Sequence, residues 1–244
     1  MKKLIIILFL LATWQLTYYI FRLNFSYIPS PINIFQAFLS GLSNGELLIH
    51  AMASLQRVLI GYLIASIVGV TLALLLGYFR TLGNNLRVII ELLRPIPPIA
   101  WIPIAILLFG LGNASAYFIV FLGSFFPIFT NTYLGVLSLP RIYKNITASF
   151  EINKFTYFVK ILLFFSLPYI FTGLRIGIGM AWMSVIAAEL IGAQSGLGYY
   201  IQINRLLLRT DNILVGMILI GFIGFSLNEL LELLERIVIR WKRN

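Results

Sequence analysis

The sequence predicts an all-α membrane protein with six transmembrane helices and both termini in the cytoplasm. Hydrophobic residues make up 60% of the 244 residues and charged residues only 11%, whereas a soluble domain carries about 25% charged residues. The mean hydropathy is +0.97. Apolar stretches of about 20 residues, the length that a helix needs to cross a bilayer, recur along the chain. Lipid is therefore the expected solvent.

The first predicted span covers residues 4–21. Two lysines precede it, so a secretory signal is the alternative, but the apolar run continues to Phe21 and Ala12-Thr-Trp offers no small-x-small cleavage site. We therefore favour an uncleaved helix. A long outer loop up to Ala53 follows, and its Pro29-Ser-Pro31 turn and mildly amphipathic stretch suggest that it lies on the outer membrane face. Residues 1–53 thus form a first segment.

The other five spans form a core over residues 54–237, with a cytoplasmic loop at 138–160 and a basic tail at 238–244. The third span is short and begins with prolines. The fifth exceeds one span, so its part before Pro168 is expected to lie along the surface. These five spans cover residues 58–79, 96–109, 114–139, 161–191 and 213–234.

The basic residues support this topology. Thirteen of the eighteen Lys and Arg residues fall on the side assigned to the cytoplasm, as the positive-inside rule requires. The outer side receives Arg22, Arg57, Arg205 and Arg209. The net charge of +10 therefore reflects membrane topology rather than binding of nucleic acid.

Several chemistries are excluded by missing residues. There is no phosphate-binding GxxxxGK[ST] loop, so the chain itself does not bind ATP in that manner. There is no cysteine, and His50 is the only histidine, placed in the outer loop, so no metal cluster is expected. Ser184 and Ser195 lack a histidine partner for a hydrolase triad. No cofactor is expected in this chain.

The stretch RPIPPIAWIP, from Arg94 to Pro103, is the most unusual in the chain. Proline removes a backbone donor and clashes with the preceding helical turn. Broken backbone at membrane depth is tolerated only where protein or a water-lined cavity satisfies it. We expect Arg94, paired with Glu91, to mark the inner boundary and the helix to start near Ala100, buried in the core of a translocation bundle. Whether it touches substrate stays open. The candidate residues are Pro95, Pro97, Pro98, Trp101 and Pro103.

Two charged residues lie within the fifth span, Arg175 in its inner half and Glu189 toward its outer end. Ionisable groups inside a bilayer face a protein interior or a water-filled path by default. A structural role, snorkelling or capping a helix end, is the alternative for both. Trp182 lies between them and belongs to the same candidate set, for the path or for core packing. The Gly173-x-x-x-Gly177 spacing indicates close helix packing.

Three blocks in order carry a resemblance to a known family: SLQRVLIGY from Ser54, residues 91–115, and residues 167–198. They resemble permease subunits of bacterial ATP-binding-cassette (ABC) importers of type I fold, in the branch for nitrate, taurine and other sulfonates. The resemblance implies an inner-membrane location and a second permease copy, often identical. It also implies two cytoplasmic ATPases that bind ATP, and an extracytoplasmic binding protein that delivers a small oxyanion.

The same family carries a cytoplasmic coupling helix with the pattern Glu-Ala-Ala-x-x-x-Gly, followed by Leu-Pro. The resemblance places this helix at residues 145–151, where glutamate replaces the glycine. We expect a surface helix with Phe150 as an aromatic knob, followed by an altered turn because glutamate does not adopt a positive φ without strain. The implied coupling residues are Ala148, Ser149, Phe150, Glu151, Leu167 and Pro168.

Two other functions stay open. A non-transporting assembly or signalling subunit with the same fold would explain the altered coupling loop. A membrane-embedded enzyme is the other alternative, although the chain lacks any cluster of catalytic side chains.

Overall fold

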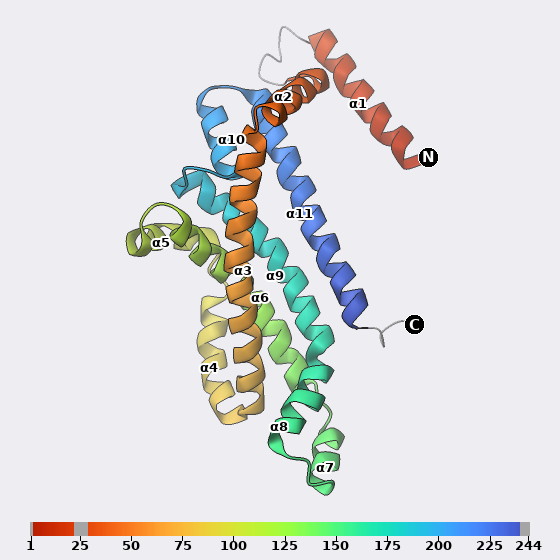
Figure 1. The fold of residues 1–244 in the computed structure, drawn as a ribbon, viewed down its shortest axis with the longest axis vertical. Helices are drawn as coiled ribbons and strands as arrows, with labels where there is room; N and C mark the ends of the chain where they lie inside the picture. Colours follow the sequence, from red (N-terminus) through yellow and green to blue (C-terminus); the bar gives the residue numbers. More distant parts are fainter. Residues whose placement is uncertain (1, 22–28, 240–244) are drawn as a thin grey trace.

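The computed structural model describes residues 2–21 and 29–239, and every regular element in these residues is helical. The order of the elements is easily followed in Figure 1. They are α1 (Lys2–Phe21), α2 (Pro31–Ser43), α3 (Glu46–Tyr78), α4 (Arg80–Leu93), η1 (Pro98–Trp101), α5 (Ile102–Phe109), α6 (Asn113–Leu137), α7 (Arg141–Ser149), α8 (Lys154–Thr156), η2 (Tyr157–Leu162), α9 (Leu163–Gly192), α10 (Leu197–Leu206) and α11 (Thr210–Val238).

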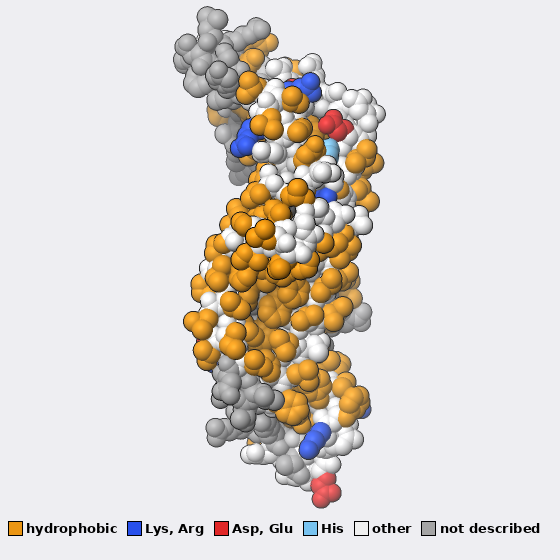
Figure 2. All heavy atoms as spheres, turned by 90° about the vertical axis from the view of Figure 1, so that its left-hand side faces the viewer, with side chains coloured by type: hydrophobic (Ala, Val, Ile, Leu, Met, Phe, Trp, Pro, Cys, Tyr) orange, Lys and Arg blue, Asp and Glu red, His pale blue; other side chains and the backbone are white. Residues whose placement is uncertain are grey.

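The described residues contain four helices long and apolar enough to cross a membrane: α3, α6, the continuous run Lys154–Gly192 that includes α9, and α11. A fifth crossing results if α4 and the segment Pro98–Phe109 count as one span bent by 93°. Figure 2 shows apolar side chains over the middle of one face and most charged groups toward its two ends. The prediction of an all-helical membrane protein is therefore confirmed, with four or five candidate spans.

Helices α3 and α6 pack through a stripe of three glycines. Gly61, Gly69 and Gly77 of α3 each face a β-branched residue of α6, namely Val120, Ile128 and Val136 in that order. A Cβ atom at Gly77 would lie only 2.3 Å from a methyl carbon of Val136. Because the three pairs follow the same order along both helices, α3 and α6 run parallel.

A parallel pair requires the chain to return along the bundle between its two helices. Helix α3 ends at Tyr78, whereas α6 starts at Asn113 beside Arg57, whose Nε lies 2.8 Å from the Asn113 Oδ1. The intervening α4, η1 and α5 therefore lead the chain back from one end of α3 toward the other (Figure 1).

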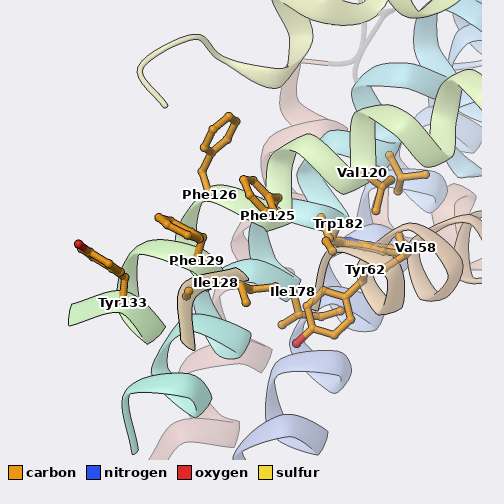
Figure 3. Close-up of a cluster of buried hydrophobic side chains, with 14 of the residues drawn as sticks. Val58, Tyr62, Val120, Phe125, Phe126, Ile128, Phe129, Tyr133, Ile178 and Trp182 are labelled. Atoms are coloured by element: carbon orange, nitrogen blue, oxygen red, sulfur yellow. The ribbon is translucent and has the colours of Figure 1, made fainter. Parts of the chain in front are cut away.

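Helix α9 packs antiparallel to α6. Ser184 lies against Gly123, Tyr169 lies against Gly135, and Ile128 fits between Gly173 and Gly177. The last contact shows that the small-residue spacing at Gly173 and Gly177 serves close packing. An aromatic row follows one side of α6 in the same core, and Figure 3 shows three of its members. The stacked rings belong to Phe121, Phe125, Phe129 and Tyr133.

Helix α11 covers the other side of α9. The Trp182 Nε1 donates to the carbonyl of Ile220 at 2.9 Å, and Gly224 leaves room for the same indole. At the opposite end of the bundle from α7, the α2 residue Ile34 shares a small core with Tyr200 and other apolar side chains. Helix α1 lies outside the packed bundle in Figure 1.

Two sequence expectations about the element boundaries are wrong. Residues 46–53 are not an outer loop, because α3 starts at Glu46, and α2 forms a separate helix before it. Two polar residues in this first part of α3 lower its hydropathy; His50 is half-buried and contacts Gly196, whereas Glu46 is exposed.

The stretch before Pro168 is not a separate surface segment either. It continues α9 through the π-helical turn η2, where the amide of Leu163 donates to the carbonyl of Phe158. Pro168 lies inside α9. The π-helical turn holds one residue more than an α-helical turn, and the chain stays helical on both sides of it and through Pro168.

Candidate functional site

The proline string breaks a helix midway instead of delaying its start. Helix α4 runs to Leu93, and Pro97 is extended at φ −64° and ψ 142°. The short 3₁₀ turn η1 follows, and α5 leads away at 93° to the second half of α4. The predicted break is present, but helical chain lies on both sides of it.

A hollow of about 190 Å³ lies beside this break. We call it the central hollow. Its walls come from the proline string, from the middle of α6 and from the middle of α9. The lining residues are Arg94, Ile96, Pro98, Leu122, Gly123, Phe126, Pro127, Ile176 and Met180.

The expectation that Arg94 marks the inner boundary is wrong, because its side chain lines the hollow beside the middle of α6, where it is exposed in a single copy of the chain. Helix α4 rises about 21 Å from Arg80 to Leu93 at 1.5 Å per residue, which brings Arg94 level with the centre of α6. The expected ion pair with Glu91 is also wrong. The Glu91 carboxylate instead binds Arg87 one turn earlier, at 2.6 Å. Among the described residues, the Arg94 side chain has no hydrogen bond or ion pair.

The rest of the proline string is only partly enclosed. Pro95, Pro97 and Pro103 are exposed, and Trp101 is half-buried. The Trp101 Nε1 has no hydrogen-bond acceptor among the described residues. In α5 one face packs on α6, but Leu107 is 85% exposed. Burial of this segment in the core of a translocation bundle stays a prediction.

A second constellation is built around Arg57 and Glu189. The Arg57 Nη1 lies 2.8 Å from the Glu189 Oε1, and both side chains are almost fully buried. The remaining donors of the guanidinium reach the Asn113 Oδ1 and both the backbone carbonyl and the Oγ of Ser195, at 2.6 to 2.8 Å. Ser54 donates to the Glu189 carboxylate. We call these five residues the Arg57–Glu189 network.

The loop before α10 closes over the Glu189 carboxylate. The amide of Gly198 donates to the Glu189 Oε2 at 3.0 Å, and the amide of Leu197 donates to the Ser54 Oγ at 2.8 Å. Gly196 has φ +107°, and a Cβ atom there would lie 2.2 Å from the carboxylate. Only glycine satisfies both conditions.

His50 belongs to the same end of the bundle. It lies in α3, half-buried, and its Nδ1 accepts from the amide of Gly196 at 3.1 Å. Its ring also contacts Tyr199 and Tyr200. Burial raises the pKa of Tyr200 to about 12, so this phenol stays protonated at neutral pH. The expectation of a solvated loop histidine is wrong, because a helix and not a loop carries it.

The other predicted path residues lie apart from the central hollow. Arg175 binds Glu232 at 3.2 Å and Glu235 at 3.3 Å, which ties α9 to α11. Trp182 packs against α11, as described above. Glu189 lies inside its network and does not line the hollow. A role for these residues in a substrate path stays a prediction.

The predicted coupling segment forms α7 and the turn behind it. Phe150 is 75% exposed, as expected for an aromatic knob. Glu151 has φ +52°, and the amide of Ile152 donates back to the carbonyl of Thr147 at 3.0 Å. This is a Schellman turn with a residue other than glycine at its left-handed position.

The expectation that Glu151 would avoid a positive φ is therefore wrong. The other members of the predicted set are divided between two elements. Ala148 and Ser149 lie in α7, whereas Leu167 and Pro168 lie half-buried in α9.

Sequence reasoning missed Arg57, Ser54 and Asn113 as partners of Glu189. Their spacing held a signal, because Ser54 and Arg57 lie three residues apart on one face of an otherwise apolar helix. The central hollow gave no such signal, because its three walls come from segments far apart in the chain.

These features together define a class of protein. A bundle of membrane-length helices with a broken helix beside a hollow is an arrangement found in transport proteins. Residues 61–244 match the family described as binding-protein-dependent transport system inner membrane component, and the chain belongs to this family.

Three relatives have informative names. A putative ABC transporter permease protein of Methanocaldococcus jannaschii is 40% identical over 203 residues, covering 83% of this chain and 76% of the relative. The nitrate import permease protein NrtB of Synechococcus elongatus is 34% identical over 93% of this chain and 86% of its own. The bicarbonate transport system permease protein CmpB of the same organism is 37% identical over 82% and 72%.

The sequence-based family assignment is thus confirmed. The chain is a multi-pass permease subunit of an ABC importer in the inner membrane, and it is a transport protein rather than an enzyme. Permeases of this family work with partner ATPases and with a substrate-binding protein.

Proposed function

We propose that this permease carries a small oxyanion, such as nitrate, hydrogencarbonate or a sulfonate, through the central hollow. The observation that carries the proposal is the position of Arg94. It is the charged residue among those lining the hollow, and no carboxylate lines it. An ionisable side chain at mid-membrane depth marks a substrate path by default. The nitrate and bicarbonate permeases among the relatives support the same substrate class.

A topology of six spans with both termini in the cytoplasm fits this proposal. The spans would be α1, α3, the broken α4–α5, α6, the α9 run and α11. The parallel order of α3 and α6 and the antiparallel order of α9 support alternating crossings in this sequence. The basic residues near the end that holds α7 support a cytoplasmic position for that end. Residues 1–53 would then flank a transport core at 54–237, followed by the basic tail.

The proposed assembly has two copies of this permease, two ATPases and an extracytoplasmic binding protein. The ATPases would dock on α7, where Phe150 projects as the knob. From the turn at Glu151 the chain enters the helical run Lys154–Gly192, which supplies Ile176 and Met180 to the hollow. A movement of α7 would therefore be transmitted along one continuous helix to the substrate path.

The Arg57–Glu189 network would hold the far end of that helix against α3 and α10. Its buried hydrogen bonds favour rigid-body rocking of this end over local opening. A non-transporting assembly subunit is less well supported, because one part of the argument for it was an altered turn in the coupling loop. The Schellman conformation at Glu151 preserves the backbone that a glycine would adopt there.

The test is transport by the complete importer in liposomes, assembled with its own ATPase and binding protein. We expect Arg94→Gln to lower anion uptake at least about tenfold, because a hydrogen bond between a charged group and an anion contributes about 1.5–3 kcal/mol. Arg94→Lys should keep part of the uptake. Arg87→Gln is the matched control, since this nearby arginine is paired with Glu91 and does not line the hollow. Equal uptake by the Arg94→Gln and Arg87→Gln variants would refute the proposed path.

A further inference from the structure

The central hollow contains a hydrogen-bond acceptor as well as a positive charge. Pro127 lies inside α6 and has no amide hydrogen. The carbonyl four residues earlier, that of Gly123, therefore lacks its usual α-helical donor. Gly123 and Pro127 both line the hollow, one turn apart on the same face of α6. Because Gly123 itself lines the hollow, a ligand bound there lies close to this peptide group.

Two other polar side chains nearby on α6, those of Ser124 and Asn131, already have partners. The Ser124 Oγ donates to the carbonyl of Val120 at 2.7 Å, and the Asn131 Nδ2 donates to the carbonyl of Pro127 at 2.8 Å. The remaining lining residues are apolar apart from Arg94. The hollow thus offers a guanidinium that only donates and a carbonyl that only accepts. Its volume of about 190 Å³ far exceeds the 10–15 Å³ that one water molecule needs.

We infer that the central hollow favours oxyanions that carry a hydrogen-bond donor, such as the O–H of hydrogencarbonate, over oxyanions that only accept, such as nitrate. The inference rests on the proposed function, since it assigns the substrate class of the same path. Arg94 binds the anionic oxygens, and the Gly123 carbonyl accepts the donor hydrogen. Pro127 is the specificity-determining residue, because it leaves that carbonyl free.

Hydrogencarbonate and nitrate form a matched pair for this argument. Both are planar anions with one negative charge and four heavy atoms, and they differ chiefly in one O–H group. Nitrate would leave the Gly123 carbonyl without a donor in a largely apolar site. A site built around a polar group discriminates against a ligand that leaves this group unpaired. One unsatisfied buried acceptor corresponds to a preference of about tenfold.

The test measures binding of isotope-labelled hydrogencarbonate and nitrate to the permease–ATPase complex in nanodiscs, by NMR line broadening. The binding protein is omitted, because its own selectivity would mask that of the permease. The wild type should bind hydrogencarbonate about tenfold more tightly than nitrate. Pro127→Ala restores an amide donor to the Gly123 carbonyl, so it should bring the two affinities to within about twofold of each other.

Pro31→Ala is the control, because Pro31 begins α2 and does not line the hollow. It should keep the wild-type preference. A Pro127→Ala variant with an unchanged preference would overturn the inference, and so would a wild type that binds both anions equally. Co-purification of each permease variant with the ATPase subunits checks that the variant is folded.

The outcomes separate this inference from the proposed function. If Arg94→Gln abolishes binding of both anions while Pro127→Ala changes nothing, the anion path stands and the donor selectivity falls. If the wild-type complex binds neither anion, both proposals fail together. Loss of the preference in the Pro127→Ala variant, with total anion binding retained, supports both.

Discussion

Arg57 on α3 and Glu189 on α9 form a buried ion pair with 2.8 Å between the Nη1 and the Oε1, and their side chains are 5% and 0% exposed. The two residues lie 132 positions apart in the chain. Their partners come from the start of α6 and from the loop before α10. One buried contact thus fixes the ends of four elements relative to one another.

Neutralising one member of this pair should destabilise the protein strongly. Glu189→Gln leaves the Arg57 guanidinium buried without a counter-charge, which costs about 3–5 kcal/mol when one partner of a buried pair is removed. The measurement is thermal unfolding of the purified complex. Glu91→Gln is the matched control, because its pair with Arg87 is exposed and such pairs contribute about 1 kcal/mol or less. Similar losses in both variants would mean that the buried pair is not structural.

The glycine stripe of α3 should tolerate no added methyl group. Gly77→Ala places a Cβ atom 2.3 Å from Val136, so we expect a loss of about 1–3 kcal/mol from overpacking. Gly221→Ala is the control, since its Cβ would meet nothing within 4 Å. It should raise stability by about 0.5–1 kcal/mol, because alanine is the better helix former.

A compensating substitution tests the cause of that loss. Val136→Ala removes the methyl groups that the new Cβ would strike, so it should recover much of the stability of Gly77→Ala. Thermal unfolding of the single and double variants gives this comparison. No recovery in the double variant would show that the stripe serves something other than packing of α3 on α6.

The turn behind α7 stores strain that glycine would relieve. Glu151 has φ +52°, and the left-handed conformation costs about 1–2 kcal/mol for a residue with a Cβ atom. Glu151→Gly should therefore raise the free energy of unfolding by about 1 kcal/mol. Ser149→Gly, inside α7, should lower it by up to about 1 kcal/mol. Hydrogen exchange of the 141–152 amides reports both changes locally, and destabilisation by Glu151→Gly would contradict the strained turn.

Phe150 and Phe155 offer a matched pair for the coupling site. They are 75% and 76% exposed, so neither contributes much to the core. We expect Phe150→Ala to insert normally but to lose substrate-stimulated ATP hydrolysis by its partner ATPases. Phe155→Ala should keep most of this activity. Unchanged stimulation in the Phe150→Ala importer would remove Phe150 from the coupling site.

Arg175 should act in packing and not in anion recognition. Its guanidinium is held by the carboxylates of Glu232 and Glu235, which leaves it little attraction for an anionic substrate. Arg175→Gln should therefore keep anion uptake within about twofold of wild type. The free energy of unfolding should fall by about 1 kcal/mol or less, because these ion pairs are partly exposed. A loss of uptake as large as that of Arg94→Gln would place Arg175 in the substrate path.

Local sequence was sufficient to identify the helices, the broken helix and the family. Long apolar runs and the proline string predict such elements directly, because hydropathy and the missing proline amide act within one segment. The motif blocks around residues 54–62, 91–115 and 167–198 likewise indicated the class of importer before any contact between them was known. The turn at Glu151 shows where local sequence was not sufficient. A residue with a Cβ atom disfavours a positive φ, yet the chain between α7 and α8 requires one there.

Residue depth and pairing were decided only by the tertiary structure. The sequence placed Arg94 at a membrane boundary and Arg57 in the outer region, yet the first lines the central hollow and the second is buried against Glu189. The depth of Arg94 in the bundle depends on where α4 starts beside α3. The pairing of Arg57 with Glu189 depends on the glycines that let α3, α6 and α9 approach one another. Both follow from packing between distant segments, which hydropathy along the chain does not record.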